Sequence, residues 1–135
     1  MSSARQIYTL GIKPNWSPEA TKRFGTWESL HAIVEADLAR AGRNGFPCTL
    51  QVMNPDDIDG SIEELRQALT AKKDELAGFL IGAGLRGNPD VVFLERALQT
   101  VREVLETDVP IMFNDGPDRH CWAIGRRFGV DMNVE

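Results

Sequence analysis

The sequence has few cysteines, no long apolar run and no excess of basic residues, and each shortage excludes a class of protein. Only Cys48 and Cys121 are present, outside any CxxC or HExxH pattern, so we expect neither a disulfide framework nor a zinc site. No apolar run approaches the roughly 20 residues that span a bilayer, so no membrane partner is expected. The N-terminal stretch MSSARQIYTLGIKP lacks the apolar segment of a signal peptide, which predicts a cytoplasmic protein.

Basic residues are outnumbered: 15 Lys and Arg stand against 20 Asp and Glu, for a formal net charge of -5. Broad binding to nucleic acid needs a basic surface that displaces counterions, so we expect no nucleic-acid partner. A local basic cluster can still attract a small anion. What the sequence does have is 42% hydrophobic and 26% charged residues over a length of 135, which suits one globular domain spanning 1–135.

Four short apolar segments, each followed by a helical pattern, indicate strands. Short, nearly continuously apolar strands are typical of a parallel sheet that is buried on both faces. Alternation of strand and helix implies right-handed crossovers and helices on both faces of the sheet. We therefore predict an α/β fold with three layers, α/β/α, and a four-stranded parallel sheet of order 2-1-3-4, flavodoxin-like or half-Rossmann. The expected strands are 7–12, 46–53, 77–81 and 109–113.

Apolar residues at helical spacing predict the helices, and polar residues predict their ends. Thr26 is expected to cap the first helix and Gly42 to stop it. A capping box at 61–64 is expected to open the second, and Asn88 with Pro89 the third. A fourth, shorter helix is expected over 117–128. The apolar stripes of the first three helices are Leu30, Ile33, Val34, Leu38 and Ala41; Ile62, Leu65 and Leu69; and Leu94, Ala97, Leu98, Val101, Val104 and Leu105.

The order 2-1-3-4 also predicts where a ligand would bind. In open parallel sheets, ligands lie outside the carboxyl ends of the strands, where the strand order reverses, here between the first and third strands. The loops at that edge are rich in Asn, Asp, Pro and Gly. The first of them, 13–25, is long for a connection that usually takes about 2–6 residues. Within it, Trp16 either packs the loop onto the body or forms a wall of a pocket.

Residues 82–87 read GAGLRG, which matches the letters of the dinucleotide fingerprint G-x-G-x-x-G. The stretch follows the third strand rather than the first, Asn88 and Pro89 restart the chain after it, and no acidic residue ends the next strand. We therefore expect no nicotinamide or flavin cofactor, and no other cofactor. Glycines in a tight turn before a helix, together with Arg86, favour a small anion instead. The alternative is a turn whose Arg86 points into solvent or pairs with an aspartate.

The predicted ligand is a small molecule that carries a phosphate or a carboxylate. Lys13 and Arg86 would supply charge, residues 82–88 backbone donors, Asn114 orientation and Trp16 a wall. The predicted ligand-binding residues are Lys13, Asn15, Trp16, Gly82, Gly84, Arg86, Asn88 and Asn114. Whether the protein is an enzyme stays open; if it is one, Asp115 and His120 are the candidate acid and base groups.

Other reactive side chains are interpreted as structural. Cys121 next to His120 is a poor nucleophile–base pair, because adjacent helix residues do not face each other. His31 stands beside the apolar stripe of the first helix. Asp56, Asp57 and Asp59 cap the second helix and place charge at its start. The first and third strands end in Lys13 and Gly82 rather than in acidic residues, so no magnesium or other metal site is expected.

The pattern IYTLGIKP … CTLQVMNPDD … GFLIGAGLRGNPDVVFLERALQTVRE … PIMFND resembles a set of small bacterial single-domain α/β proteins, Rossmann-like or flavodoxin-like, with a GAGLR-type loop. The resemblance covers most of the chain and implies a free-standing domain, but the set has no established activity to carry over. It draws attention to Arg86 and Asn114, which stand in the resembling stretches. A rival hypothesis is a non-enzymatic oligomer, such as a homodimer, or an interaction module that uses Trp16 and Trp122.

Overall fold

A four-stranded parallel sheet forms the centre of the computed structural model, which describes residues 6–13, 22, 25–86, 90–105 and 108–135. The strand order is β2-β1-β3-β4, and all three pairs of neighbours are parallel. The predicted α/β class and the order 2-1-3-4 are therefore confirmed, although the strands β2 and β4 begin two residues later than expected. The strands are β1 (Gln6–Ile12), β2 (Cys48–Met53), β3 (Leu76–Ile81) and β4 (Ile111–Phe113).

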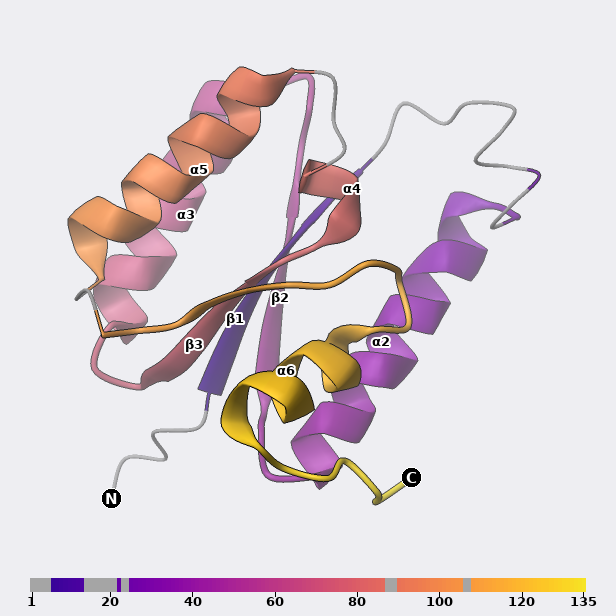
Figure 1. The fold of residues 1–135 in the computed structure, drawn as a ribbon. Helices are drawn as coiled ribbons and strands as arrows, with labels where there is room; N and C mark the ends of the chain where they lie inside the picture. Colours follow the sequence, from indigo (N-terminus) through magenta and orange to yellow (C-terminus); the bar gives the residue numbers. More distant parts are fainter. Residues whose placement is uncertain (1–5, 14–21, 23–24, 87–89, 106–107) are drawn as a thin grey trace.

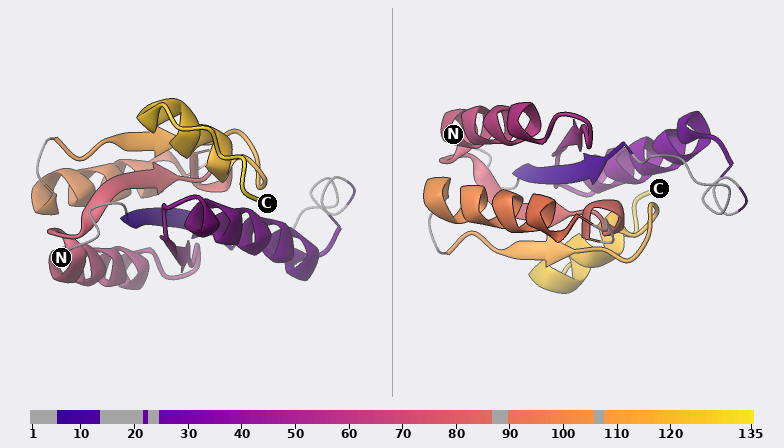
Figure 2. Two further views of the ribbon diagram at one scale, coloured as in Figure 1. Left: turned by 90° about the horizontal axis from the view of Figure 1, so that it is seen from below. Right: turned by 90° about the horizontal axis from the view of Figure 1, so that it is seen from above.

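Two pairs of helices cover the two faces of the sheet. Helix α3 packs against α5, and α2 packs against α6. Figure 1 shows the first pair on one side of the strands and the second pair on the other, and the views from below and above in Figure 2 show the same separation. No helix in the described ranges is long and apolar enough to cross a membrane. The helices are α2 (Trp27–Arg43), α3 (Ile58–Lys72), α4 (Ala83–Arg86), α5 (Val91–Val104) and α6 (His120–Phe128).

Strand β1 contributes side chains to both faces, because successive residues of a strand point to opposite sides. Tyr8, Leu10 and Ile12 belong to the buried cluster under α3 and α5. Ile7 belongs to the cluster on the other face, with residues of α2 and α6. Gly11 follows on that second face and carries no side chain there, so β1 leaves space between its carboxyl end and α2.

Helix α2 begins as predicted but ends later. Thr26 caps it, because the Thr26 hydroxyl accepts a hydrogen bond from the Ser29 N–H at 3.1 Å. The predicted stop at Gly42 is wrong, since the helix continues to Arg43. The turn that follows uses Gly45, whose φ of +94° is a conformation that glycine adopts without steric cost.

Helix α3 begins before the expected capping box. It starts at Ile58, and the carboxylate of Asp57 accepts a hydrogen bond from the Gly60 N–H at 2.9 Å. The prediction of a box opened by Ser61 is wrong, whereas the prediction that an aspartate caps this helix is confirmed. Ser61 lies inside the helix, and its hydroxyl accepts from the Asn54 N–H at 2.8 Å. Ser61 therefore connects the end of β2 to α3 by a hydrogen bond and does not cap the start of α3.

Helix α5 also has a different cap from the one expected. It begins at Val91, and the side chain of Asp90 accepts a hydrogen bond from the Val92 N–H at 3.1 Å. Asp90 thus takes the capping role that was assigned to Asn88. Asn88 and Pro89 themselves lie outside the described residues.

Candidate functional site

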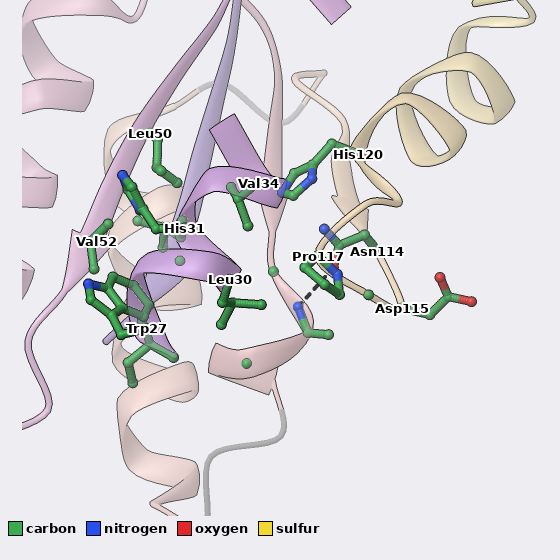
Figure 3. A pocket seen from close by; sticks show the side chains of 17 residues that line it. Trp27, Leu30, His31, Val34, Leu50, Val52, Asn114, Asp115, Pro117 and His120 are labelled. Carbon is green, nitrogen blue, oxygen red and sulfur yellow. Dashed lines mark hydrogen bonds between the residues drawn. The ribbon is translucent and has the colours of Figure 1, made fainter. Parts of the chain in front are cut away.

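A pocket of about 300 Å³ opens at the carboxyl edge of the sheet. It lies where β1 and β3 run side by side, the point at which the strand order reverses and the edge at which the site was predicted. Figure 3 shows side chains of α2 on one side of the pocket and the loop between β4 and α6 on the other. The lining residues are Leu10, Gly11, Ile12, Trp27, Leu30, His31, Val34, Leu50, Val52, Gly82, Ala83, Gly84, Asn114, Asp115, Gly116, Pro117 and His120.

The walls of this pocket are mainly apolar. Helix α2 and strand β2 supply large apolar side chains, and the ends of β1 and β3 supply glycines and further aliphatic groups. Among the described lining residues, His31, Asn114, Asp115 and His120 bring polar side chains, Trp27 adds its indole N–H, and none is Lys or Arg. A concave apolar surface with a few polar groups is the usual composition of a site for a small molecule.

Helix α2 contributes most of one wall, which was not predicted from the sequence. Trp27, Leu30, His31 and Val34 lie at spacings of three and four residues, so they share one side of the helix. The Trp27 and His31 rings are 5.4 Å apart, and His31 Nε2 lies 3.2 Å from the carboxylate of Glu35. The spacing was visible in the sequence, but it is the same spacing that indicates a core-facing stripe.

Gly82 allows the end of β3 to lie directly against β1. Its N–H donates to the Leu10 carbonyl at 2.9 Å, and a Cβ built on Gly82 would lie only 2.9 Å from that same oxygen. The glycines with positive φ among the described residues are Gly25, Gly45 and Gly129, so Gly82 serves close approach rather than a left-handed turn. The stretch after it is not the tight turn that was expected, because residues 83–86 form the short helix α4.

Asn114 joins this short helix to the end of β4. Its side chain is 2% exposed, and its Oδ1 accepts a hydrogen bond from the Ala83 N–H at 2.8 Å, drawn as the dashed line in Figure 3. Because both Ala83 and Asn114 line the pocket, the bond fixes two of its walls relative to each other. Asn114 was predicted as an orienting residue, and the structure places it at the pocket.

Asp37 and His120 form a buried pair that connects α2 to α6. The exposed fraction is 8% for Asp37 and 3% for His120. Oδ2 of Asp37 lies 2.6 Å from the backbone nitrogen of His120, 3.2 Å from that of Cys121 and 3.2 Å from Nδ1 of the His120 ring. Arg119, at the N-cap position of α6, makes no capping hydrogen bond with its side chain, so Asp37 caps this helix from another helix.

Asp37 is held in its ionised form. Burial alone would raise the pKa of its carboxyl group, but hydrogen bonds from the His120 ring and from the backbone N–H groups of His120 and Cys121 outweigh burial and lower it. An ionised carboxylate can only accept hydrogen bonds, so the proton between Asp37 and His120 is on Nδ1. Asp37 could not be recognised from the sequence, because an aspartate in the middle of a helix looks like a solvent-facing residue until its neighbours in space are known.

Asp115, the other candidate acid or base, has a different environment. Its carboxylate forms an ion pair with Arg119 at 2.9 Å, and 59% of its side chain is exposed. Figure 3 shows this carboxylate pointing away from the other labelled side chains, although Asp115 contributes to the lining. His120 is thus the candidate whose ring the structure brings into the pocket.

The remaining predicted binding residues lie outside the pocket or outside the described residues. Lys13 is exposed at the end of β1, where its N–H donates to the Met53 carbonyl at 3.0 Å, and it does not line the pocket. Arg86 is the last residue of α4, but its side chain is outside the described part of the chain. Asn15, Trp16 and Asn88 also lie outside it.

Neither cysteine has the properties of a nucleophile. Cys121 is buried, and its thiol donates to the Asp37 carbonyl at 3.3 Å. Burial, together with the negative charge of Asp37, raises the pKa of Cys121 to about 11, and burial raises the pKa of Cys48 to about 12. In the described ranges, no group of three His, Cys, Asp or Glu side chains could hold a metal ion.

Comparison of the chain with protein-family models, with curated proteins and with solved structures gives no match.

Proposed function

We propose that this protein binds a small molecule at the carboxyl edge of its sheet, with the apolar part of the ligand inside the pocket and a phosphate or carboxylate at the rim. The observation that carries the proposal is the apolar pocket of about 300 Å³ at the point where the strand order reverses. That volume is at the lower end of the range of about 300–1,000 Å³ for small-molecule sites, so the ligand is small. Ligand binding of this kind is compatible with catalysis but does not require it.

The side chains of the pocket support an apolar ligand body. Trp27, Leu30 and Val34 line it from α2, and Leu50 and Val52 line it from β2. Each 100 Å² of apolar surface that a ligand buries here contributes about 2.5 kcal/mol of transfer free energy before the cost of association is subtracted. A planar ring or a short branched chain fits these walls better than a fully hydrated sugar or an inorganic ion.

The sequence around the pocket supports an anionic group at its rim. Lys13 follows the lining residue Ile12, and Arg86 ends the helix that contributes Ala83 and Gly84 to the lining. Both basic residues therefore stand next to lining residues in the chain, and Lys13 itself does not line the pocket. An anion at the rim would keep contact with water and avoid the cost of burying an unpaired charge among apolar walls.

A thermal-shift screen of aromatic and aliphatic carboxylates and phosphates tests the proposal. We expect Val34→Trp to fill the pocket and abolish the stabilisation that a ligand produces. Ile33→Trp is the matched control, because Ile33 is the neighbouring residue on α2, is 40% exposed and does not line the pocket. Equal ligand-induced shifts in the two variants would show that the ligand does not bind in this pocket.

A second set of variants tests the anionic part of the ligand. Arg86→Ala and Lys13→Ala should reduce the shift produced by a carboxylate or phosphate, while the shift produced by its neutral amide or alcohol analogue stays the same. Arg102→Ala is the control, since Arg102 is exposed on α5 and does not line the pocket. A carboxylate shift that survives both substitutions would exclude a role for these two residues.

One observation favours a second candidate function, a homodimer or interaction module. Ile111 and Phe113 are 40% and 38% exposed on the edge strand β4, although both are large and apolar. Trp122, proposed from sequence as part of an interface, is 37% exposed, but the guanidinium groups of Arg119 and Arg126 each lie over its ring at 4.3 Å. Sedimentation of the wild type and Phe113→Lys tests a dimer formed through the edge of β4, and a monomeric wild type would exclude the homodimer.

We also propose that the chain is a bacterial, cytoplasmic protein of the α/β set that its glycine-rich loop resembles. Support comes from the GAGLR stretch at 82–86 and from the four-stranded parallel sheet. Cell fractionation tests the location, and recovery of the protein in a membrane or secreted fraction would contradict it.

A further inference from the structure

The Asp37–His120 pair has an arrangement that a simple helix cap does not need. Capping α6 requires only the two backbone N–H groups that Oδ2 of Asp37 accepts from. The same oxygen also holds Nδ1 of the His120 ring at 3.2 Å, which fixes the rotation of the imidazole. His120 lines the pocket, and Figure 3 shows its ring directed toward Val34 and the interior.

This arrangement leaves one ring nitrogen for a ligand. Nδ1 carries a proton whether the imidazole is neutral or charged, because its partner Asp37 is an acceptor. Nε2 is then the ring nitrogen left for a ligand, because the ring's hydrogen bond among the described residues is the one between Nδ1 and Asp37. A carboxylate that orients a histidine in this way also stabilises the imidazolium when the second proton arrives.

We propose that His120 is an acid/base group that takes a proton from an acidic O–H or N–H group of the ligand, with Asp37 as its positioning residue. The proposal rests on the binding function proposed above, because it requires a ligand in the pocket. In the transfer, the O–H or N–H bond of the ligand breaks, its electron pair stays on the ligand, and a bond forms between the proton and Nε2. The products are a ligand anion and an imidazolium next to the Asp37 carboxylate, so charge and atoms balance without a further reactant.

The surroundings define the class of ligand more narrowly. The other titratable groups that line the pocket among the described residues are His31, from α2, and Asp115, from the loop before α6, whose carboxylate pairs with Arg119. Most side chains that line the pocket are apolar, including Val34, toward which Figure 3 shows the His120 ring directed. A phenol, an enol or a heteroaromatic N–H compound combines a flat apolar body with one acidic group, and it fits these walls.

The groups packed around the pair from the other side also bear on its protonation. The Cys121 thiol donates a hydrogen bond to the backbone carbonyl of Asp37. The negative charge of Asp37 also contributes, after burial, to the raised pKa of Cys48. The positive charges of Arg40 and Arg43, on α2, lower the pKa of Cys121, but burial and Asp37 outweigh them. Both thiols have raised pKa values and stay neutral near neutral pH, so Asp37 is the negative charge that directly contacts the ring.

A pair of chromophoric probes tests the proposal. Para-nitrophenol has an acidic O–H group and absorbs differently as phenol and phenolate, whereas para-nitroanisole has nearly the same shape and no acidic proton. At a pH where the free phenol is mostly neutral, we expect the protein to bind both probes and the bound phenol to show the phenolate spectrum. Failure of the phenol to bind, or binding without the phenolate spectrum, would overturn the proposal.

Variants separate positioning from folding. His120→Phe should lose the phenolate signal, and a nitroanisole titration of the same variant measures separately whether its pocket still binds a ligand of this shape. Asp37→Asn keeps an oxygen that can accept from the two backbone N–H groups of α6, so α6 stays capped. We expect this variant to bind nitroanisole as the wild type does but to show a smaller phenolate fraction. A phenolate fraction that is unchanged in both variants would contradict the roles of His120 and Asp37.

Val34→Trp distinguishes a failure of this proposal from a failure of the proposed binding function. If it abolishes binding of nitroanisole, the pocket is the site, and the phenolate signal alone decides the role of His120. If nitroanisole binds to Val34→Trp as it does to the wild type, the binding site lies elsewhere and both proposals fail.

Discussion

Replacement of Asp37 by alanine should destabilise the protein strongly, because three hydrogen bonds between two helices depend on one oxygen. The substitution removes the cap of α6, which is worth about 0.5–2 kcal/mol. It also leaves the buried His120 N–H without its acceptor at 2.6 Å, and stranding a buried donor costs about 1–3 kcal/mol. Allowing for partial relaxation, we expect the free energy of unfolding to fall by about 3 kcal/mol, which lowers Tm by about 10 °C in a chain of this size.

Urea denaturation of the wild type, Asp37→Ala and Asp37→Asn measures the effect. Asparagine keeps an acceptor oxygen for the backbone of α6 but carries no charge, so it should cost about 1 kcal/mol. The pH dependence gives a second check. Because the folded pKa of Asp37 is lowered, its carboxylate stabilises the fold above the unfolded pKa, and this stabilisation is lost as the pH falls through the folded pKa. The difference between wild type and Asp37→Asn should therefore shrink in acid.

Two results would contradict this role of Asp37. If Asp37→Ala unfolds within about 0.5 kcal/mol of the wild type, the buried pair does not hold α6 against α2. If the difference between wild type and Asp37→Asn is the same at neutral and acid pH, Asp37 does not gain its stabilising effect from ionisation.

Three further predictions concern the fold around the site. Gly82→Ala should lower the free energy of unfolding in urea by about 1–3 kcal/mol, because its Cβ would lie 2.9 Å from the Leu10 carbonyl oxygen. Gly11→Ala is the control: its Cβ would make an ordinary contact with Leu50 at 3.5 Å, and it should lose no stability. Burial raises the pKa of Tyr8, the sole tyrosine, to about 12, so its absorbance should titrate later in the folded protein than in urea, and the fold should lose stability as the pH rises toward that value; equal titrations would contradict this. Burial likewise raises the pKa of Cys121 to about 11, so native protein should react with a thiol reagent at neutral pH far more slowly than unfolded chain, and equal rates would contradict it.

The strand order and the layers were predictable because they depend on pattern. Short apolar segments that alternate with helical stripes leave few topologies, and the right-handed crossover rule reduces them further. Helix ends were less predictable, since several polar residues compete for each cap. Asp57 and Asp90 took the roles assigned to Ser61 and Asn88, because each lies where the described chain enters its helix.

The edge of the sheet at which the pocket lies was predictable, but most of its walls were not. Asn114 and His120 stand in the loop and helix after β4, so the topology alone directs attention to them. Trp27 and His31 have the spacing of a core stripe, and the spacing alone does not show that they face a pocket lined on its other sides by glycines such as Gly11 and Gly82. The partner of His120 lies 83 residues away in the chain, and no local pattern encodes such a distance.

The most direct test of ligand binding at the sheet edge is a methyl NMR titration with para-nitroanisole. The expected result is a set of chemical-shift changes on Leu30, Val34, Leu50 and Val52, which line the pocket from two different elements. Chemical-shift changes confined to Ile111 on the exposed edge of β4, with no change at the pocket methyl groups, would contradict ligand binding in this pocket.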